Sequence, residues 1–436
     1  MLHRSLVRSV ILSLTLAGAA RAQSTWFVDA SAAAGGDGSS WASAFTTLDD
    51  ALEVAQRFDE IWVADGLYTP ALPPAGDPRM ARFFVPRDLK LFGGFAGGEP
   101  SVDQRAGLFD QTVLSGDIGV PGLAGDNCYH VVETWGAVTI DGFRITGGNA
   151  LGSAEPNGAG ILLSIGQISI DPDIFQGSGL RLRHSRIDHH SSSRGGAIYG
   201  QLAGVQFSDC IFEDNEATGI GGAISLQASQ ARIDLCEFVN NRSGSHGGAF
   251  HGASMSVDTT GRPFLGFVGC LFRENRAGGS GGALYLGGSA FSSGKAYLSS
   301  CTIALNAASA GGGGIFAQTT TQVPAVCWLE NSIVFHNRGP SNQDIFGTLS
   351  CWNSIAPGQA GPGVTGLNPR FVNVRAKDLR LRPDSPAVDA GDFARLPFDA
   401  TDVDDDGNVL ERIPIDLDGT TRLLGAALDL GAWERP

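Results

Sequence analysis

A short acidic segment near the carboxyl end, DVDDDGNVLE at residues 402–411, contains the residue types of a calcium site. Three aspartates alternate along it, a glycine then permits a sharp turn, and a glutamate adds another carboxylate. In an EF-hand loop a last acidic ligand would stand where this chain has Ile413, so the segment departs from that motif. We therefore expect a structural Ca²⁺ loop, with a solvated acidic turn as the alternative. The expected ligands are Asp402, Asp404, Asp406 and Glu411.

The segment LRLRHSRID, residues 180–188, offers a different chemistry. Its apolar and charged residues alternate, which predicts a strand with one charged outer face. A polysaccharide lyase needs a cation or base at the α-proton of a uronate, and a glycoside hydrolase needs a pair of carboxylates. The histidines His184, His189 and His190 do not share one position in the surrounding repeats, so we expect no transition-metal site from them. The candidate catalytic residues are Arg181, Arg183, Arg186 and Asp188.

Ring-bearing side chains recur one position after an inward apolar residue in several short segments of the type GGAI. If these segments are strands in register, the rings form a row on the outer surface, where they can stack against sugar rings. The alternatives are that a loop at residues 252–264 covers the row, or that the rings only favour β structure. The row comprises Tyr199, Ser225, His251, Tyr285 and Phe316, and its members other than the serine are candidate ligand-binding residues.

These side chains can come together only if the segments between them fold in register, and a repeat provides that register. CEFVNNRSGSHGGAF at residues 236–250 has near-copies that begin at Cys210, Cys270 and Cys301. Successive copies begin about 25 to 34 residues apart, and their apolar residues alternate with a period of two, as in β-strands. Each copy contains three short strands that can bury their inner faces only by stacking on other copies. The predicted fold class is all-β, a right-handed parallel β-helix.

Positions within the repeat have predicted structural roles. The cysteine and the large apolar residue two positions later face the core, where each aromatic ring buries apolar surface. The asparagine five positions after the cysteine lies at a bend, where it tolerates a left-handed backbone and can bond its neighbour in the next coil. Glycine pairs such as Gly221 and Gly222 let the chain turn back into the third strand. The repeated asparagines are Asn215, Asn241, Asn275, Asn306 and Asn337.

The chain has seven cysteines, which raises the question of disulfides. Four of them occupy the same repeat position, and parallel side chains on neighbouring strands have the wrong mutual direction for a good bridge. We expect these four to form a ladder of reduced thiols. A disulfide, if there is one, would join Cys327 and Cys351. The members of the thiol ladder are Cys210, Cys236, Cys270 and Cys301.

The amino-terminal residues predict export and then a cap on the coil stack. Residues 1–22 combine arginines, a short apolar run and an Ala-Arg-Ala sequence that ends at Ala22, which is typical of a secretory signal peptide. No later segment has the roughly 20 apolar residues of a transmembrane helix. TTLDDALEVAQRF predicts a short helix with Thr47 as its N-cap and with Leu48 and Leu52 on one apolar face. Such a helix would cover the open end of a β-helix.

The charge of the chain limits its partners. The formal net charge is −15, and loss of a signal peptide would make the mature chain more acidic still. This balance argues against nucleic acid and against an anionic membrane surface, and it favours cations or neutral glycans as partners. Glycine makes up 61 of 436 residues, about twice the usual share, which indicates many tight turns.

Several segments resemble known families. FVDASAAAGGDGSSWASAFTTLDDALEVA, EIWVADGLYTP and LFGGFAGGEPSVDQR resemble the amino-terminal half of exported proteins of the pectin-lyase-like right-handed β-helix superfamily. The CxFxxN…GGAI units resemble the repeats of the chlamydial polymorphic outer membrane proteins, and the stretch from SPAVDAGD to DLGAWE is similar to the choice-of-anchor Q module. The resemblance implies an exported β-helix, often without an assigned activity. That module commonly precedes a surface anchor, whereas Pro436 follows it directly here, which leaves tethering in doubt.

The sequence thus predicts a signal peptide at 1–22, a β-helix at 23–355 and a choice-of-anchor-Q-like module at 356–436. We expect a monomeric protein, secreted or at the cell surface, that binds a glycan or a partner surface without catalysis. The alternative is a polysaccharide lyase or hydrolase acting on a uronate-containing polymer. No catalytic motif of the superfamily's enzymes is matched, and a fold does not imply a function. A cleft where arginines and carboxylates converge would favour the enzyme, and a flat face with aromatic rings would favour binding.

Overall fold

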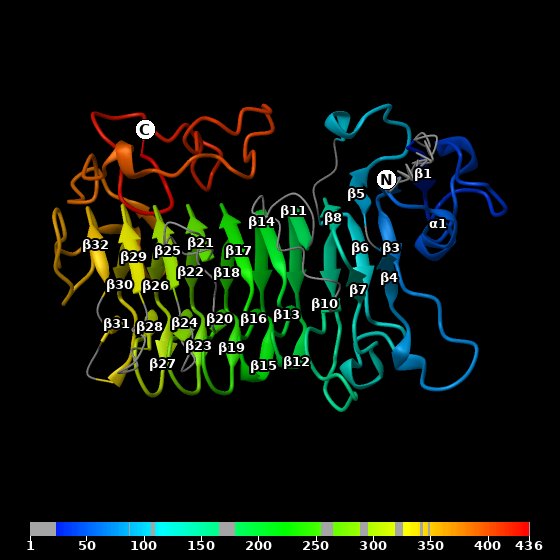
Figure 1. Cartoon of the computed structure of the whole chain (residues 1–436), viewed down its shortest axis with the longest axis horizontal. Coiled ribbons are helices and arrows are strands. Elements are labelled where there is room, and N and C mark those ends of the chain that lie inside the picture. The colour runs from blue at the N-terminus through cyan, green and yellow to red at the C-terminus, as the bar shows by residue number, and fades with distance from the viewer. Residues whose placement is uncertain are drawn as a thin grey trace, which may run out of the picture.

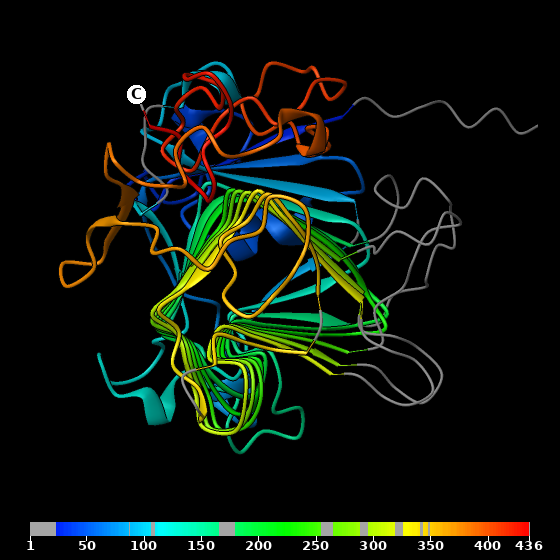
Figure 2. The ribbon, with the colours of Figure 1, turned by 90° about the vertical axis from the view of Figure 1, so that its left-hand side faces the viewer.

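The computed structural model describes residues 23–435 except residues 87, 106–109, 165–178, 254–264, 288–294, 319–325, 341–342 and 348. The predicted signal peptide therefore lies outside the described residues. Parallel strands stack along one long axis (Figure 1), and viewed along that axis the successive coils superimpose (Figure 2). The chain is a right-handed parallel β-helix, as the repeat predicted.

The largest sheet has 18 strands and receives one or two strands from most coils. We call it the large sheet. Its strands are β1 (Thr25–Val28), β2 (Glu60–Ala64), β3 (Gly66–Tyr68), β5 (Leu89–Phe95), β6 (Thr112–Ser115), β8 (Val138–Asp141), β9 (Arg144–Thr146), β11 (Leu180–Asp188), β14 (Gly204–Glu213), β17 (Gln230–Asp234), β18 (Glu237–Val239), β21 (Leu265–Val268), β22 (Leu271–Arg273), β25 (Lys295–Ser299), β26 (Thr302–Ala304), β29 (Val326–Glu330), β30 (Ile333–Phe335) and β32 (Ser350–Trp352).

Two smaller parallel sheets complete the coils. The nine-stranded sheet contains β4 (Phe83–Pro86), β7 (Val132–Trp135), β10 (Ile161–Ser164), β13 (Ile198–Gln201), β16 (Ile224–Gln227), β20 (Phe250–Ala253), β24 (Leu284–Gly287), β28 (Ile315–Ala317) and β31 (Ile345–Phe346). The five-stranded sheet contains β12 (Ser191–Arg194), β15 (Glu216–Ile220), β19 (Arg242–Ser243), β23 (Arg276–Ala277) and β27 (Ala307–Ala308).

The core has the register that the repeat predicted. Phe212, Phe238 and Phe272 are Cα partners in successive coils. Their rings stack with centroid separations of 4.9 and 4.6 Å and interplanar angles of 7° and 3°. All three side chains are fully buried. Because side chains alternate between the two faces of a strand, this register also decides which polar residues face outward.

Buried asparagines join the coils at the bend that follows the large sheet. The side-chain amide of Asn241 donates to Oδ1 of Asn275 at 3.0 Å, and that of Asn275 donates to Oδ1 of Asn306 at 2.9 Å. The same pattern continues to Asn337, whose amide donates to Oδ1 of Asp344 at 2.9 Å. We call Asn215, Asn241, Asn275, Asn306 and Asn337 the asparagine ladder.

The left-handed backbone at this bend was assigned to the wrong residue. The positive φ belongs to the residue before each asparagine, for example 60° at Glu274 and 63° at Leu305. The asparagine itself turns its side chain inward, where it satisfies backbone groups of two coils. The glycine pairs behave as expected, since Gly221 and Gly247 have φ of 66° and 67°.

All seven cysteines are buried and free. The expected ladder of reduced thiols is present, and burial raises the pKa of the Cys236 and Cys270 thiols. Cys327 and Cys351 are not bridged. Their strands pair with Cys351 opposite Leu329, two residues along the strand from Cys327, so the two cysteines are not opposite each other, and neither belongs to the thiol ladder.

The expected capping helix is present as α1 (Leu48–Val54), at the amino-terminal end of the coil stack (Figure 1). Oγ1 of Thr47 accepts the backbone N–H of Asp50 at 3.2 Å, and Leu48 is buried against the core. No helix in the described part of the chain is long and apolar enough to cross a bilayer.

After β32 the chain runs back along the outer face of the large sheet (Figures 1 and 2). We call residues 353–435 the C-terminal segment. It contains one antiparallel pair, β33 (Phe371–Asn373) with β34 (Asp378–Leu381), and a 3₁₀ turn at Phe393–Arg395. Outward-facing apolar residues of the sheet are buried beneath it, among them Leu235, Val268 and Leu271. The segment therefore packs as a second layer on one side of the β-helix.

Candidate functional site

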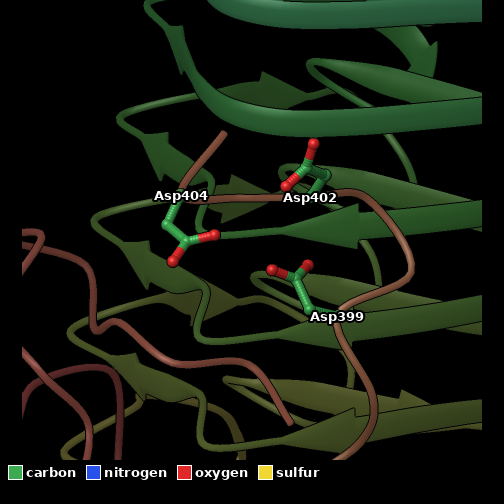
Figure 3. Close-up of side chains that lie close together, drawn as sticks. All are labelled: Asp399, Asp402 and Asp404. Atoms are coloured by element: carbon green, nitrogen blue, oxygen red, sulfur yellow. The ribbon is translucent and has the colours of Figure 1, made fainter. Parts of the chain in front are cut away.

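The predicted acidic loop brings its carboxylates together in two overlapping groups. Oxygens of Asp404, Asp406 and Glu411 lie within 4.8 Å of one another. Oxygens of Asp399, Asp402 and Asp404 meet the same limit (Figure 3). The expected residues thus converge with Asp404 at their centre. Asp399 was missed, although its place three residues before the first expected ligand is a signal in the sequence.

The local backbone of the loop explains this convergence. Asp402, Asp405 and Gly407 have φ of 55°, 59° and 81°, so the chain reverses sharply within the loop. Oδ1 of Asp402 accepts the N–H of Gly407 at 3.0 Å, and Oδ1 of Asp406 accepts the N–H of Asn408 at 2.7 Å. The contact of Asp406 with Asn408 has the spacing of an Asx turn, which aspartate commonly forms. The loop thereby gathers carboxylate oxygens, the hard ligands that Ca²⁺ prefers.

Mutual repulsion and burial perturb two carboxyl groups of the loop. Burial, together with the charges of Asp234, Asp404 and Asp402, raises the pKa of Asp399 to about 6. Burial and the neighbouring aspartates also raise the pKa of Glu411. Burial is the largest cause of both shifts, and the neighbouring negative charges add to it with no positive charge in compensation. A divalent cation bound among these oxygens would supply that compensation.

The acidic loop docks on the strand that carries the predicted catalytic face. Arg183 of β11 donates to the backbone carbonyl of Asp402 at 3.0 Å and forms an ion pair with Asp405. His184 lies beside it, with Nδ1 at 3.1 Å from Asp141 and Nε2 at 3.7 Å from Asp405. Two segments that the sequence analysis treated separately therefore form one site.

The other members of the charged face of β11 also point outward and are engaged. Arg181 donates to Oε1 of Gln206 at 3.0 Å. Arg186 lies between Asp110 and Glu213, at 2.9 and 2.6 Å. Asp188 is buried and forms an ion pair with Arg144 at 2.9 Å. The four candidates share a face, as predicted. Three of them, Arg183, Arg186 and Asp188, already form ion pairs with other residues of the chain.

The aromatic row lies on the nine-stranded sheet in the expected register, from Tyr199 to Phe316. The rings stack on one another: His251 and Tyr285 are 5.0 Å apart at 5°, and Tyr285 and Phe316 are 5.1 Å apart at 3°. Phe346, which the sequence analysis missed, extends the row at 4.6 Å and is 41% exposed. The inner rings therefore use their faces on each other. Within this stack, ring edges and the exposed Phe346 remain for a ligand, whereas among the described residues no ring contact engages Tyr199.

The expected loop over this row, residues 252–264, lies mostly outside the described residues. His251 and Tyr285 are only 6% and 9% exposed. Burial lowers the pKa of His251 to about 4, which keeps its ring neutral at ordinary pH. The neutral ring of His251 therefore contributes to packing within the stack as much as to a surface that a ligand could contact.

Comparison with known proteins gives a partial family match. A family model described as the Chlamydia polymorphic membrane protein repeat matches residues 209–227 and 269–287, which confirms the resemblance expected for the repeats. The curated proteins include none with significant similarity to the chain. The resemblance of residues 356–436 to a choice-of-anchor Q module stays a prediction.

Several solved structures have a similar course of the chain. The pectate lyase Pel9A is 12% identical over 95% of this chain and 97% of that chain, with a TM-score of 0.47. A rhamnogalacturonan lyase is 13% identical over 81% and 91%, with a TM-score of 0.39. Pectin methylesterase PemA from Erwinia chrysanthemi is 11% identical over 79% and 94%, with a TM-score of 0.35. We draw no functional argument from similarities of this size.

Proposed function

We propose that the protein is an exported or cell-surface monomer that binds a glycan or a partner surface without catalysis. The observation that supports this best is the state of the charged face on β11. Arg183 holds the acidic loop, Arg186 lies between two carboxylates, and Asp188 pairs with Arg144. A lyase or hydrolase needs such groups to act on the substrate, whereas here they stabilise the fold.

We further propose that Ca²⁺ has a structural role in the acidic loop. The loop offers carboxylate oxygens from Asp399, Asp402, Asp404, Asp406 and Glu411 within short distances, and hard oxygen ligands suit this ion. Through Arg183 the loop is joined to β11. A cation that orders the loop would therefore also fix the C-terminal segment on the β-helix.

A polysaccharide lyase or hydrolase remains the second candidate, and Arg181 is the observation in its favour. This side chain donates to the neutral Gln206 and has no carboxylate partner among the described residues. Burial and the neighbouring Arg183 lower the pKa of Arg181, which is the direction that would help a base. The negative charge of Asp402 acts in the opposite direction on the pKa of Arg181, which shows that the two side chains lie near each other. Arg181 and the acidic loop could therefore act on the same uronate.

The test is to incubate the purified protein, with Ca²⁺, with acidic and neutral polysaccharides and to follow polymer length by size-exclusion chromatography. Unchanged chains that co-elute with the protein are the expected result. Shortened chains would overturn the non-catalytic proposal, and Arg181→Gln should then abolish the shortening if that residue is the base. If the polymer is neither shortened nor co-eluted with the protein, the glycan is removed from the proposal and a protein partner remains.

A further inference from the structure

A column of arginines lies on the five-stranded sheet, away from the site described above. Arg242 in β19 and Arg276 in β23 are Cα partners on neighbouring strands. Ala307 in β27 pairs next to Arg276, and Arg338 bridges to Ala307 in the following coil. The three arginines therefore occupy one column of aligned backbone positions, with a single gap at Ala307. We call Arg242, Arg276 and Arg338 the arginine ladder.

The arginine ladder is exposed, and its charges are uncompensated. All three arginines are exposed, and none of them forms an ion pair or a side-chain hydrogen bond within the described residues. Like charges directly opposite each other on neighbouring strands destabilise a sheet. Glu216 is the Cα partner of Arg242 on the preceding strand, but the two side chains form no ion pair in the part of the chain that the structure describes. In a chain of net charge −15, such a column is unexpected unless it has an external partner.

The surroundings of the arginine ladder leave room for a ligand. A groove of about 740 Å³ runs beside it. Next to the arginines the groove is lined by small residues such as Gly244, Gly278 and Ser309, which do not cover the guanidinium groups. The five-stranded sheet lies on the opposite side of the coil from the C-terminal segment (Figures 1 and 2), so that segment does not cover it.

We propose that the arginine ladder binds an extended acidic polysaccharide along the axis of the β-helix. Neighbouring strands of a sheet are about 4.8 Å apart, so the positive charge recurs after one strand spacing between Arg242 and Arg276 and after two between Arg276 and Arg338. Guanidinium groups bind carboxylate and sulfate through paired N–H donors. A linear polymer with an anionic group on successive sugars matches this arrangement. The inference rests on the proposed function and names its ligand class and its site.

The lining favours an acidic polysaccharide over a single-stranded nucleic acid. Proteins that bind single strands without sequence preference combine a positive groove with aromatic side chains on which the bases stack. The groove has no aromatic residue in its lining. A sugar polymer needs only hydrogen-bonding and small residues between the charges.

The first experiment removes the arginine ladder. Binding of polygalacturonate to the full chain is measured by titration calorimetry at low salt, with the fully methyl-esterified polymer as the uncharged control ligand. The variant Arg242→Gln/Arg276→Gln/Arg338→Gln should bind about tenfold to a hundredfold more weakly. The matched control Arg375→Gln/Arg380→Gln/Arg382→Gln changes the net charge equally on the exposed C-terminal segment and should bind as the wild type does.

The second experiment fills the gap. Ala307→Arg should place a fourth guanidinium between Arg276 and Arg338, strengthen binding several-fold and steepen its decline with added salt. If the wild type binds and neither variant changes the affinity, the arginine ladder is not the site, while the proposed binding function stands. If the wild type binds no polysaccharide at all, this inference fails together with the glycan part of the proposed function, and a protein partner remains. Tighter ladder-dependent binding of oligo(dT) than of polygalacturonate would overturn the ligand class.

Discussion

At the scale of residues, the acidic loop depends on Asp404, which belongs to both carboxylate groups. A Ca²⁺ ion bound by either group of carboxylates would therefore have Asp404 as a ligand. We expect the melting temperature of the wild type to be higher in Ca²⁺ than in chelator, because a ligand that binds only the native state stabilises it, by about 2.7 kcal/mol at 100 times its Kd. Asp404→Asn should abolish that difference in calorimetry. Asp103→Asn, an exposed control outside the loop, should keep it. Identical wild-type curves with and without chelator would contradict the site.

The raised pKa of Asp399, about 6, makes a second residue-scale prediction. Between its ordinary value of 3.8 and about 6, the native state holds a proton that the unfolded state has lost. Stability therefore falls as the pH rises through this range. In chelator, Asp399→Asn should lose this part of the pH dependence relative to the wild type, as measured by thermal unfolding from pH 4 to 7. Buried His190 and His251, whose pKa is lowered to about 4, contribute with the opposite sign in both proteins. If the difference in stability between Asp399→Asn and the wild type is the same at every pH from 4 to 7, the raised pKa of Asp399 is contradicted.

The sequence predicted the residues of the acidic loop but not their setting. The alternation of aspartates and the glycine are local features, and a local turn satisfies them. The contact of Asp405 with Arg183 joins residues 222 positions apart and depends on the path of the C-terminal segment. No periodicity in the chain specifies that path. Arg183 was therefore expected at a catalytic face, whereas the structure shows it holding a loop.

At the scale of elements, the asparagine ladder makes each bend depend on the next. Asn275 donates to the carbonyl of Phe238 at 2.8 Å and accepts the side-chain amide and the backbone N–H of Asn241, both at 3.0 Å. Asn275→Ala would leave these buried groups without partners and should cost about 2 to 4 kcal/mol in urea unfolding. The exposed Asn368→Ala should change stability by less than about 0.5 kcal/mol. Equal effects of the two substitutions would show that the ladder is not a stabilising network.

The strands could be predicted from the repeat more fully than the bends. Period-two alternation specifies which side chains face the core, so Phe238 and Phe272 lie where the alignment placed them. At the bend, the repeat marks Asn275 but cannot distinguish a side chain that bonds neighbouring coils from a backbone that turns. The structure assigns the positive φ to Glu274 instead. The aromatic row shows the same limit, because register predicts the alignment of Tyr285 with Phe316 but not that their faces pack together.

At the scale of the whole molecule, opposite sides of the coil have different characters. One side is covered by the C-terminal segment, whose aspartates meet Arg183 and whose apolar residues bury Leu271 and Ile333 of the large sheet. The opposite side carries the arginine ladder with no such cover (Figures 1 and 2). An acidic protein thus keeps a basic column on one surface. This separation lets a polyanion approach the arginine ladder without meeting the acidic loop.

The two layers of the molecule should also respond differently to a substitution at their interface. Leu430 of the C-terminal segment is 3% exposed and shares a cluster with Leu271 and Ile333, whereas the interior of the coils forms a separate cluster. Leu430→Asp buries a charge there and should cost at least the roughly 2 to 5 kcal/mol of a large-to-small core substitution. Because the coils keep their own core, we expect the segment to detach first. Limited proteolysis with mass spectrometry should then cut within residues 353–435 while circular dichroism still reports β structure. Leu410→Asp, at a side chain that is 82% exposed, is the control. Loss of both layers in a single transition would instead show that the C-terminal segment and the β-helix unfold as one cooperative unit.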